Sequence, residues 1–180
     1  VPPLTRMIAA RRFDLYQDPM SDVPTFEGYA GETVSALYQL GAIILNGGKP
    51  VETGDAAGHL GVAHALIGHL RAFGFNASQG RIFLPWSVFA VCGVEENEVL
   101  AGQGGERMTI ALTRLSDMAR EHLAKAEVAI NALPRNLRPM FAPVAVLKAQ
   151  LAQLDVESPF QRADDLPDWR KIALLGWWKF

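Results

Sequence analysis

The longest regular pattern in this sequence is an apolar stripe between about Glu106 and Leu133. Its members recur at steps of three and four residues: Met108, Leu112, Leu115, Ala119, His122, Ala126, Ala129 or Ile130, and Leu133. A period near 3.6 places such residues on one face of an α-helix. The same spacing runs through most of the chain, and strand-type alternation is almost absent. The sequence therefore predicts an all-α fold.

Six further helices are expected. Their approximate ranges are 4–15, 24–45, 52–72, 85–91, 137–154 and 166–178. Ser21 or Asp22 is the expected N-cap of the second, and Asp164 with Asp165 should cap the last. Prolines in the first turns of 137–154 should delay its regular part. On 24–45 one inward face is expected, formed by Tyr29, Thr33, Ala36, Leu37, Leu40 and Ile44.

Composition bounds the class of protein. The chain has 180 residues, 49% hydrophobic and 20% charged, which suits one domain over 1–180 with a substantial core. Its 17 Lys and Arg are scattered and its net charge is -2, so nucleic acid is not an expected partner. The single cysteine, Cys92, indicates a reducing compartment and no internal disulfide. Because Val1 opens the sequence without a methionine, we expect the domain to be incomplete at its amino terminus.

Small residues and histidines share the helix expected over 52–72. Gly54, Ala57, Gly58, Gly61 and Ala65 recur at steps of three or four. Such a seam implies either close backbone approach or a face left open for a ligand. His59, His64 and His69 are spaced by five, so they fan around the helix axis and do not form one metal site together.

Two acids have a spacing that can serve a metal. Asp14 and Asp18 stand at i and i+4, which lets two carboxylates on one helix face share a divalent cation. Asp18 precedes Pro19, however, and a residue before proline is biased away from helix. They are therefore weak metal candidates only.

A series of motifs further along the chain resembles a known family. It consists of Tyr29 and a small-residue helix, then Gly61-x-Ala63, Arg71, Gly80-Arg81-x-Phe83-Leu84-Pro85 and Gly93-Val94. This order resembles the squalene and phytoene synthase family, over nearly the whole chain but only as that family's carboxy-terminal two thirds. The resemblance implies a single-domain helical bundle of the isoprenoid synthase type that lacks its amino-terminal helices.

The resemblance also implies an activity and a departure from it. Typical members join two prenyl diphosphates, farnesyl or geranylgeranyl, head to head, with Mg²⁺ held by two aspartate-rich motifs. In the second motif an Asp follows the arginine and another stands four residues later, whereas this chain has Ala72 and Asn76, with Phe75 where an acid commonly sits. Without those carboxylates, magnesium-dependent chemistry by this motif is not expected.

Two functions follow from the resemblance. The first is a catalytically degenerate member that needs no cofactor and binds a protein, an isoprenoid or another lipid, or a membrane surface, like the family's non-catalytic branch in complex I assembly. The second is an active prenyl transferase that uses Mg²⁺ through acids located before Val1. Bacterial cytoplasm or mitochondrial matrix, with or without peripheral membrane attachment, is the implied location.

The candidate site residues follow from the same register. Tyr29, Arg71, Asn76 and Arg81 are predicted to bind a substrate or anion, since arginine binds anions through paired hydrogen bonds. Pairing of the arginines with helix carbonyls or with acids such as Asp14 explains them equally well. Trp177 and Trp178 are predicted either to contact a membrane or to pack on the bundle.

Overall fold

The computed structural model describes residues 2–178, and every regular element in this range is helical. The longer helices are α1 (Pro2–Ala10), α2 (Val23–Ala30), α3 (Ala36–Leu45), α4 (Gly54–Arg71), α8 (Glu106–Ala132), α9 (Pro143–Ala152) and α10 (Asp168–Gly176). Three short helices are α5 (Phe73–Ser78), α6 (Trp86–Val91) and α7 (Glu96–Leu100). Two 3₁₀ turns (Arg11–Leu15 and Arg138–Phe141) and one π turn (Gly31–Ser35) complete the list. The all-α prediction is confirmed.

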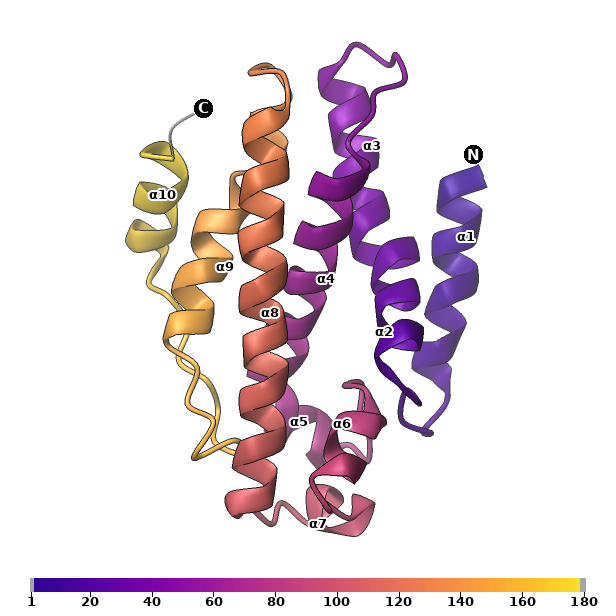
Figure 1. Cartoon of the computed structure of the whole chain (residues 1–180), viewed down its shortest axis with the longest axis vertical. Coiled ribbons are helices and arrows are strands. Elements are labelled where there is room, and N and C mark those ends of the chain that lie inside the picture. Colours follow the sequence, from indigo (N-terminus) through magenta and orange to yellow (C-terminus); the bar gives the residue numbers. More distant parts are fainter. Residues whose placement is uncertain (1, 179–180) are drawn as a thin grey trace.

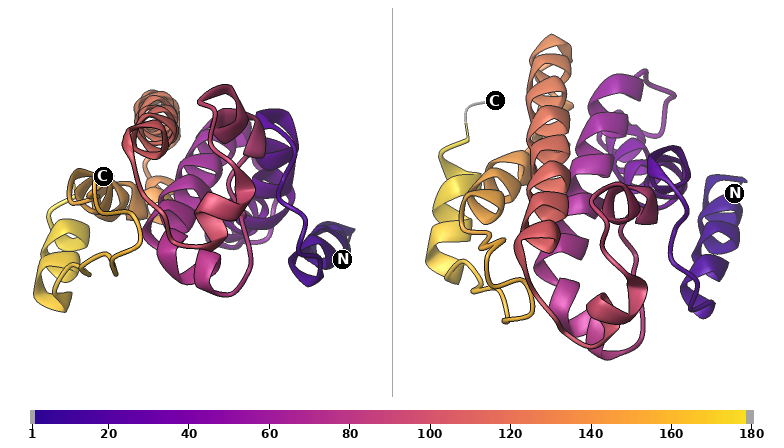
Figure 2. Two further views of the ribbon diagram at one scale, coloured as in Figure 1. Left: turned by 90° about the horizontal axis from the view of Figure 1, so that it is seen from below. Right: turned by 60° about the horizontal axis from the view of Figure 1, so that its bottom comes forward.

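The bundle is built around α4, which packs along α8 (Figure 1). In that view α9 and α10 lie to one side of α8, α1 and α2 lie to the other, and the short helices α5–α7 gather at one end. Seen from below, α4 runs through the middle of the bundle (Figure 2). It buries ten residues: Ala56, Ala57, Leu60, Gly61, Val62, Ala63, Ala65, Leu66, Ile67 and Leu70. A helix that is apolar on most sides is typical of the centre of a domain.

The small residues of α4 serve both of the purposes expected of them. At Gly61 the backbone of the π turn comes so near that an added Cβ would lie 2.6 Å from the backbone nitrogen of Ser35 and 2.7 Å from its Cα. At Gly58 an added Cβ would meet nothing within 4 Å. One part of the seam therefore permits close packing, and another part is left open.

The helix expected over 24–45 is continuous but irregular. The segments α2, the π turn and α3 run end to end, and Asp22 caps the start by accepting a hydrogen bond from the backbone N–H of Thr25 (2.9 Å). A π turn holds more residues than an α turn, so the inward face shifts beyond it. Tyr38 and Ala42 are buried there, whereas Leu37 is 48% exposed and Ile44 is 75% exposed. The predicted inward face is therefore wrong for these two residues.

The carboxy-terminal part also differs from expectation. The predicted cap by Asp164 and Asp165 is wrong, because α10 begins at Asp168 with Pro167 as its N-cap and without a side-chain bond. Two helices were not expected, α5 and α7. The second of these has a capping box in which Glu95 and Glu98 bond each other's backbone N–H. The late regular start of 137–154 is confirmed by a 3₁₀ turn that precedes α9.

Within residues 2–178, none of the helices has both the length and the apolarity that crossing a bilayer demands.

Candidate functional site

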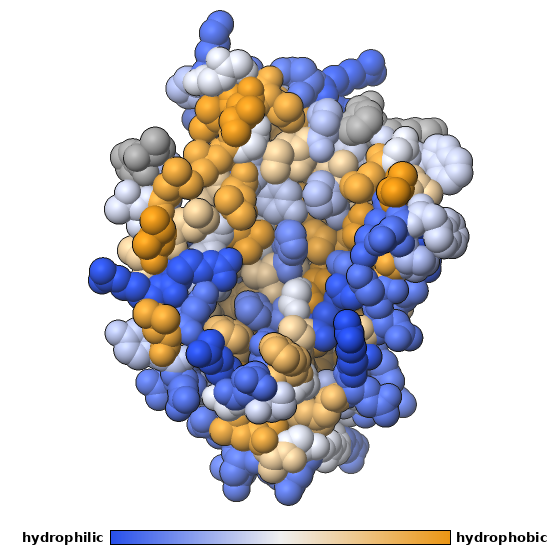
Figure 3. Space-filling model, turned by 180° about the vertical axis from the view of Figure 1, so that it is seen from behind, coloured by the Kyte–Doolittle hydropathy of each residue, from blue (hydrophilic) through white to orange (hydrophobic). Residues whose placement is uncertain are grey.

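The face opposite to that of Figure 1 is hollowed in its middle (Figure 3). A cavity of about 320 Å³ is lined by Arg11, Tyr29, Val34, His64, Ala65, Gly68, His69, Ala72 and Asn76. A larger one, of about 780 Å³, is lined by Gly68, Arg71, Ala72, Gly74, Phe75, Ser78, Phe160, Gln161, Arg162, Ala163 and Asp165. The two cavities share Gly68 and Ala72, so they adjoin each other beside the end of α4, and together they are called the hollow below.

A hydrogen-bonded cluster borders the smaller cavity. Tyr29 donates to Oδ1 of Asp14 (2.7 Å), while Nη1 of Arg11 donates to the Tyr29 hydroxyl (3.0 Å) and to Oδ2 of Asp14 (3.1 Å). Burial, and then the hydrogen bond to Asp14, raise the pKa of Tyr29 above its ordinary value. The phenol therefore stays protonated, and the Asp14 carboxylate is committed to these two partners.

The histidines at this cavity are held by aromatic neighbours. His69 stacks on Phe83 with ring centres 5.0 Å apart, and Nδ1 of His64 lies 3.0 Å from the Tyr38 hydroxyl. Burial lowers the pKa of His69 to about 4, so its imidazole is neutral at pH 7. Among the residues that line the smaller cavity, Arg11 thus supplies a fixed positive charge and no side chain is a carboxylate.

The four predicted binding residues are only partly brought together. Tyr29 and Asn76 line the smaller cavity and Arg71 lines the larger one, whereas Arg81 lines neither. Arg71 donates to the backbone carbonyl of Asp164 (3.3 Å) and to Oδ1 of Asp165 (3.1 Å). Arg71 therefore has structural partners, with Asp165 as the acid instead of Asp14, and its binding role stays a prediction.

The positions where the family resemblance implies acids lie at the junction of α4 and α5. Ala72 and Asn76 both face the smaller cavity, and the backbone N–H of Asn76 bonds the Ala72 carbonyl at 2.8 Å. Phe75 lines the larger cavity and is 69% exposed. The backbone positions that would carry those acids therefore lie at the two cavities. They bear a methyl group at Ala72, an amide at Asn76 and an aromatic ring at Phe75.

The weak metal candidates are separated by the local backbone. Asp14 lies in the 3₁₀ turn, whereas Asp18 lies beyond its end and outside any helix, so the two do not share a helix face. Across residues 2–178, no three His, Cys, Asp or Glu side chains are gathered as they would be around a metal ion.

Sequence reasoning missed three ionisable residues of the smaller cavity. Arg11, His64 and His69 line the smaller cavity, yet none was predicted as a site residue. For two of them, the spacing to a neighbouring residue in the sequence could have pointed to the cavity. His64 lies one turn before Gly68, and Arg11 stands three residues before Asp14, which is the spacing of an ion pair in a helical turn.

The carboxy-terminal tryptophans have different surroundings. Trp177 is 84% exposed, while Trp178 is partly buried and packs against the hydrophobic core. Lys179 and Phe180 lie outside the described residues. Packing on the bundle thus accounts for Trp178, and Trp177 is left available to a partner.

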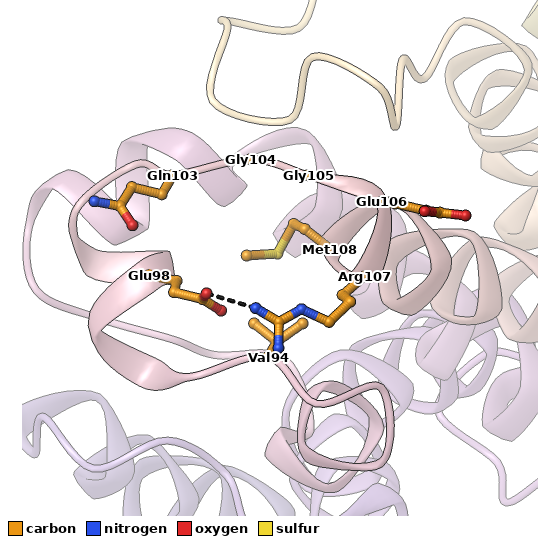
Figure 4. Close-up of a pocket in the computed structure, with 8 residues that line it drawn as sticks. All are labelled: Val94, Glu98, Gln103, Gly104, Gly105, Glu106, Arg107 and Met108. Atoms are coloured by element: carbon orange, nitrogen blue, oxygen red, sulfur yellow. Dashed lines mark hydrogen bonds and ion pairs between the residues drawn. The ribbon is translucent and has the colours of Figure 1, made fainter.

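A separate pocket of about 250 Å³ lies where α7 meets the start of α8 (Figure 4). Arg107 points across it and binds Oε1 of Glu98 at 2.8 Å, while Glu106 points away from it. The backbone carbonyl of Gly93 accepts a second bond from the same guanidinium. This ion pair links α7 to the start of α8 across the pocket. We therefore assign the pocket a structural role.

Comparisons with known proteins place the chain in a family. The squalene/phytoene synthase family matches residues 1–171. The chain is similar to "NADH dehydrogenase (ubiquinone) complex I, assembly factor 6" of Bos taurus, with 26% identity over 84% of this chain and 45% of that protein. It is also similar to the 15-cis-phytoene synthase of Synechococcus elongatus, with 27% identity over 97% of this chain and 61% of that protein.

The fold has solved counterparts as well. A crystal structure of a dehydrosqualene synthase in complex with a ligand superposes with a TM-score of 0.76 at 18% sequence identity, over 97% of this chain and 62% of that one. The chain therefore spans less than two thirds of the length of each of these three relatives. With the helical bundle and the match over nearly its whole length, the chain belongs to the squalene/phytoene synthase family.

Proposed function

We propose that this protein is a non-catalytic member of its family that acts by binding a protein partner, in a role like that of the complex I assembly factor to which it is similar. One observation carries the proposal. Ala72 and Asn76 occupy the cavity wall where the family's magnesium-binding acids are expected, and the cavity's lining has a guanidinium and no carboxylate.

The electrostatics of the smaller cavity disfavour a magnesium–diphosphate complex. Mg²⁺ demands a near-octahedral shell of oxygens and is normally held by one or two carboxylates. Here Asn76 offers one neutral oxygen, and Arg11 places a positive charge beside it. The nearby carboxylate of Asp14 already binds Arg11 and Tyr29. Without the ion, a leaving diphosphate loses stabilisation worth several kcal/mol.

The hollow remains suited to binding without turnover. Arg11, the Tyr29 hydroxyl and the Asn76 amide offer hydrogen bonds to an anionic or polar group, and Val34 and Ala65 offer apolar surface. An isoprenoid or lipid held there would be a ligand of the assembly factor and not a substrate. The location that goes with this function is the mitochondrial matrix or the bacterial cytoplasm, beside the respiratory enzyme that the protein serves.

A titration with farnesyl diphosphate tests the loss of catalysis. We expect calorimetry to give the same weak affinity with and without MgCl₂, and we expect no pyrophosphate release. The double variant Ala72→Asp with Asn76→Asp should gain magnesium-dependent affinity, because it restores two carboxylates four residues apart on the cavity wall. Ser78→Asp is the matched control, since it adds an acid to the larger cavity but not to this wall. Tight magnesium-dependent binding by the unmodified protein, with pyrophosphate release, would instead establish the active prenyl transferase.

A genetic complementation tests the assembly role. Cells that lack the gene should lose NADH–ubiquinone reductase activity, and a restored copy of the unmodified gene should recover it. If the cells instead keep that activity and lose a prenylated product, the protein acts as an enzyme and the proposal is wrong.

A further inference from the structure

Three side chains from three helices meet on the side of α4 that faces α8. His59 comes from α4, His122 from α8 and Glu27 from α2. Nδ1 of His59 lies 3.1 Å from Nδ1 of His122, and Nε2 of His122 lies 3.3 Å from Oε1 of Glu27. These residues line a pocket of about 420 Å³ that is separate from the hollow described above. Neither the family resemblance nor the proposed function gives them a role.

The contact to Glu27 orients His122 for a specific use of its other nitrogen. A neutral imidazole has one N–H and one lone pair. The carboxylate 3.3 Å from Nε2 favours the tautomer with the proton on Nε2, which leaves the lone pair of His122 on Nδ1, the nitrogen nearest His59. A histidine that ligates a metal almost always donates its second N–H to a carboxylate, a backbone carbonyl or water. The His122 side chain is 13% exposed.

The two rings are also spaced as they would be around one ion. A tetrahedral Zn²⁺ with Zn–N distances of about 2.0–2.1 Å holds two ligand nitrogens about 3.3 Å apart and their ring centres about 5.2 Å apart. The observed separations are 3.1 Å between the nitrogens and 5.1 Å between the ring centres, with 58° between the ring planes. The helices that carry the rings, α4 and α8, form the most extensive packing contact of the bundle, so this spacing is held by the core.

We propose that His59 and His122 form a binding site for a borderline divalent metal ion of the Zn²⁺ type, which cross-links α4 to α8, with Glu27 as the group that orients His122. Imidazole pairs suit such ions and do not suit Mg²⁺, which prefers oxygen. On binding, the proton on Nδ1 of His59 passes through solvent to its own Nε2, so both Nδ1 lone pairs face the ion.

Water from the open pocket completes the coordination. Asp55 lines the same pocket, but it does not join the two histidines in a three-residue metal-ligand group among residues 2–178, so the protein itself supplies two ligands. Two protein ligands make this a weak site compared with a structural zinc centre, and the ion acts as a clamp on the folded bundle. In the absence of metal, the same two nitrogens share one proton as a hydrogen bond.

A thermal unfolding series with ZnCl₂ alone, on protein without an affinity tag, tests the site. The melting temperature of the unmodified protein should rise with Zn²⁺ and stay constant with the same concentration of MgCl₂. His59→Gln and His122→Gln should each weaken Zn²⁺ binding at least tenfold by calorimetry. The matched control is His64→Gln, which removes an imidazole from the opposite side of α4 and should bind Zn²⁺ as the unmodified protein does.

Two further measurements keep the test independent of folding defects. Co²⁺ should give a visible absorption band in the unmodified protein and in His64→Gln, but not in His122→Gln, with helix content checked by circular dichroism. Glu27→Ala should keep both ligands and lower the affinity about 10–100-fold, as expected for a carboxylate that orients a ligand. The site does not exist if Zn²⁺ leaves the unmodified protein unchanged, or if His59→Gln and His64→Gln bind it equally.

Discussion

The hydroxyl of Tyr29 donates a 2.7 Å hydrogen bond to Asp14, and the same oxygen accepts one from Arg11 at 3.0 Å. This contact joins the 3₁₀ turn that follows α1 to the carboxy-terminal end of α2 at the edge of the hollow. We expect Tyr29→Phe to lower the free energy of unfolding by about 1–2 kcal/mol, because two partners lose a partly buried hydrogen bond. Urea denaturation measures the loss. Tyr16→Phe is the control, since Tyr16 is 64% exposed, and an equal loss there would contradict the explanation.

The close approach of Gly61 to Ser35 predicts a large effect from one methyl group. Gly61→Ala would place its Cβ against the backbone of the π turn, so we expect a loss of about 2 kcal/mol or more in the free energy of unfolding. Gly58→Ala lies one turn away in open space and should be neutral or stabilising by up to about 1 kcal/mol. Denaturation of the two variants side by side decides the matter. Similar losses in both would mean that helix α4 and the π turn are not in contact.

The buried imidazole of His69 predicts a pH dependence of stability. The pKa of His69 in the folded protein is about 4, below the ordinary value of 6.5. Between pH 4 and pH 6.5 the unfolded chain is therefore protonated at His69, whereas the folded chain is not. The free energy of unfolding should therefore fall as the pH drops from 6.5 towards 4, by about 2–3 kcal/mol from this residue, and this contribution should be constant above pH 7.

A variant isolates that contribution from other groups. His69→Phe keeps an aromatic ring beside Phe83 but cannot titrate. Its stability should fall less between pH 7 and pH 4.5 than that of the unmodified protein. Parallel stability curves for the two proteins would show that His69 does not titrate as its burial implies.

The bond from Arg71 to Asp165 fixes the segment that precedes α10. Arg71→Ala should change the overall stability by less than about 1 kcal/mol, because Asp165 is 58% exposed and also binds Lys171. The double variant with Lys171→Ala should release the segment, so that limited proteolysis between residues 155 and 167 becomes faster. Arg170→Ala, on the exposed side of the same helix, should leave the cleavage rate unchanged. If all three are cut alike, these contacts do not hold the segment.

The sequence predicted an element well where the pattern within that one segment is enough to define the helix. The stripe on 106–133 needs only a period of 3.6, and α8 runs over nearly that range. The face of α3 could not be predicted in the same way, because residues 36–45 are apolar at most positions and their spacing does not reveal the shift that the π turn introduces. Tyr38 is buried and Leu37 exposed for this reason.

The candidate site shows a second kind of limit. Tyr29 and Asn76 were predicted from the family register, and both line the cavity. The partners of Arg71 and the position of Arg11 depend on which loop folds over α4, and these loops have no periodic signal. Asp165 illustrates this, because its place before a helix suggested a cap while its carboxylate is bound by Arg71 and Lys171.

The π turn at Gly31–Ser35 also affects how this chain is compared with any other. A chain with plain α turns throughout would need a one-residue gap between positions 31 and 35 for buried side chains to be matched with buried ones. Without that gap, every pair on one side of the turn is offset by about 100° around the helix axis. Evolutionary profiles of α3 are therefore reliable only when the gap is placed inside the turn.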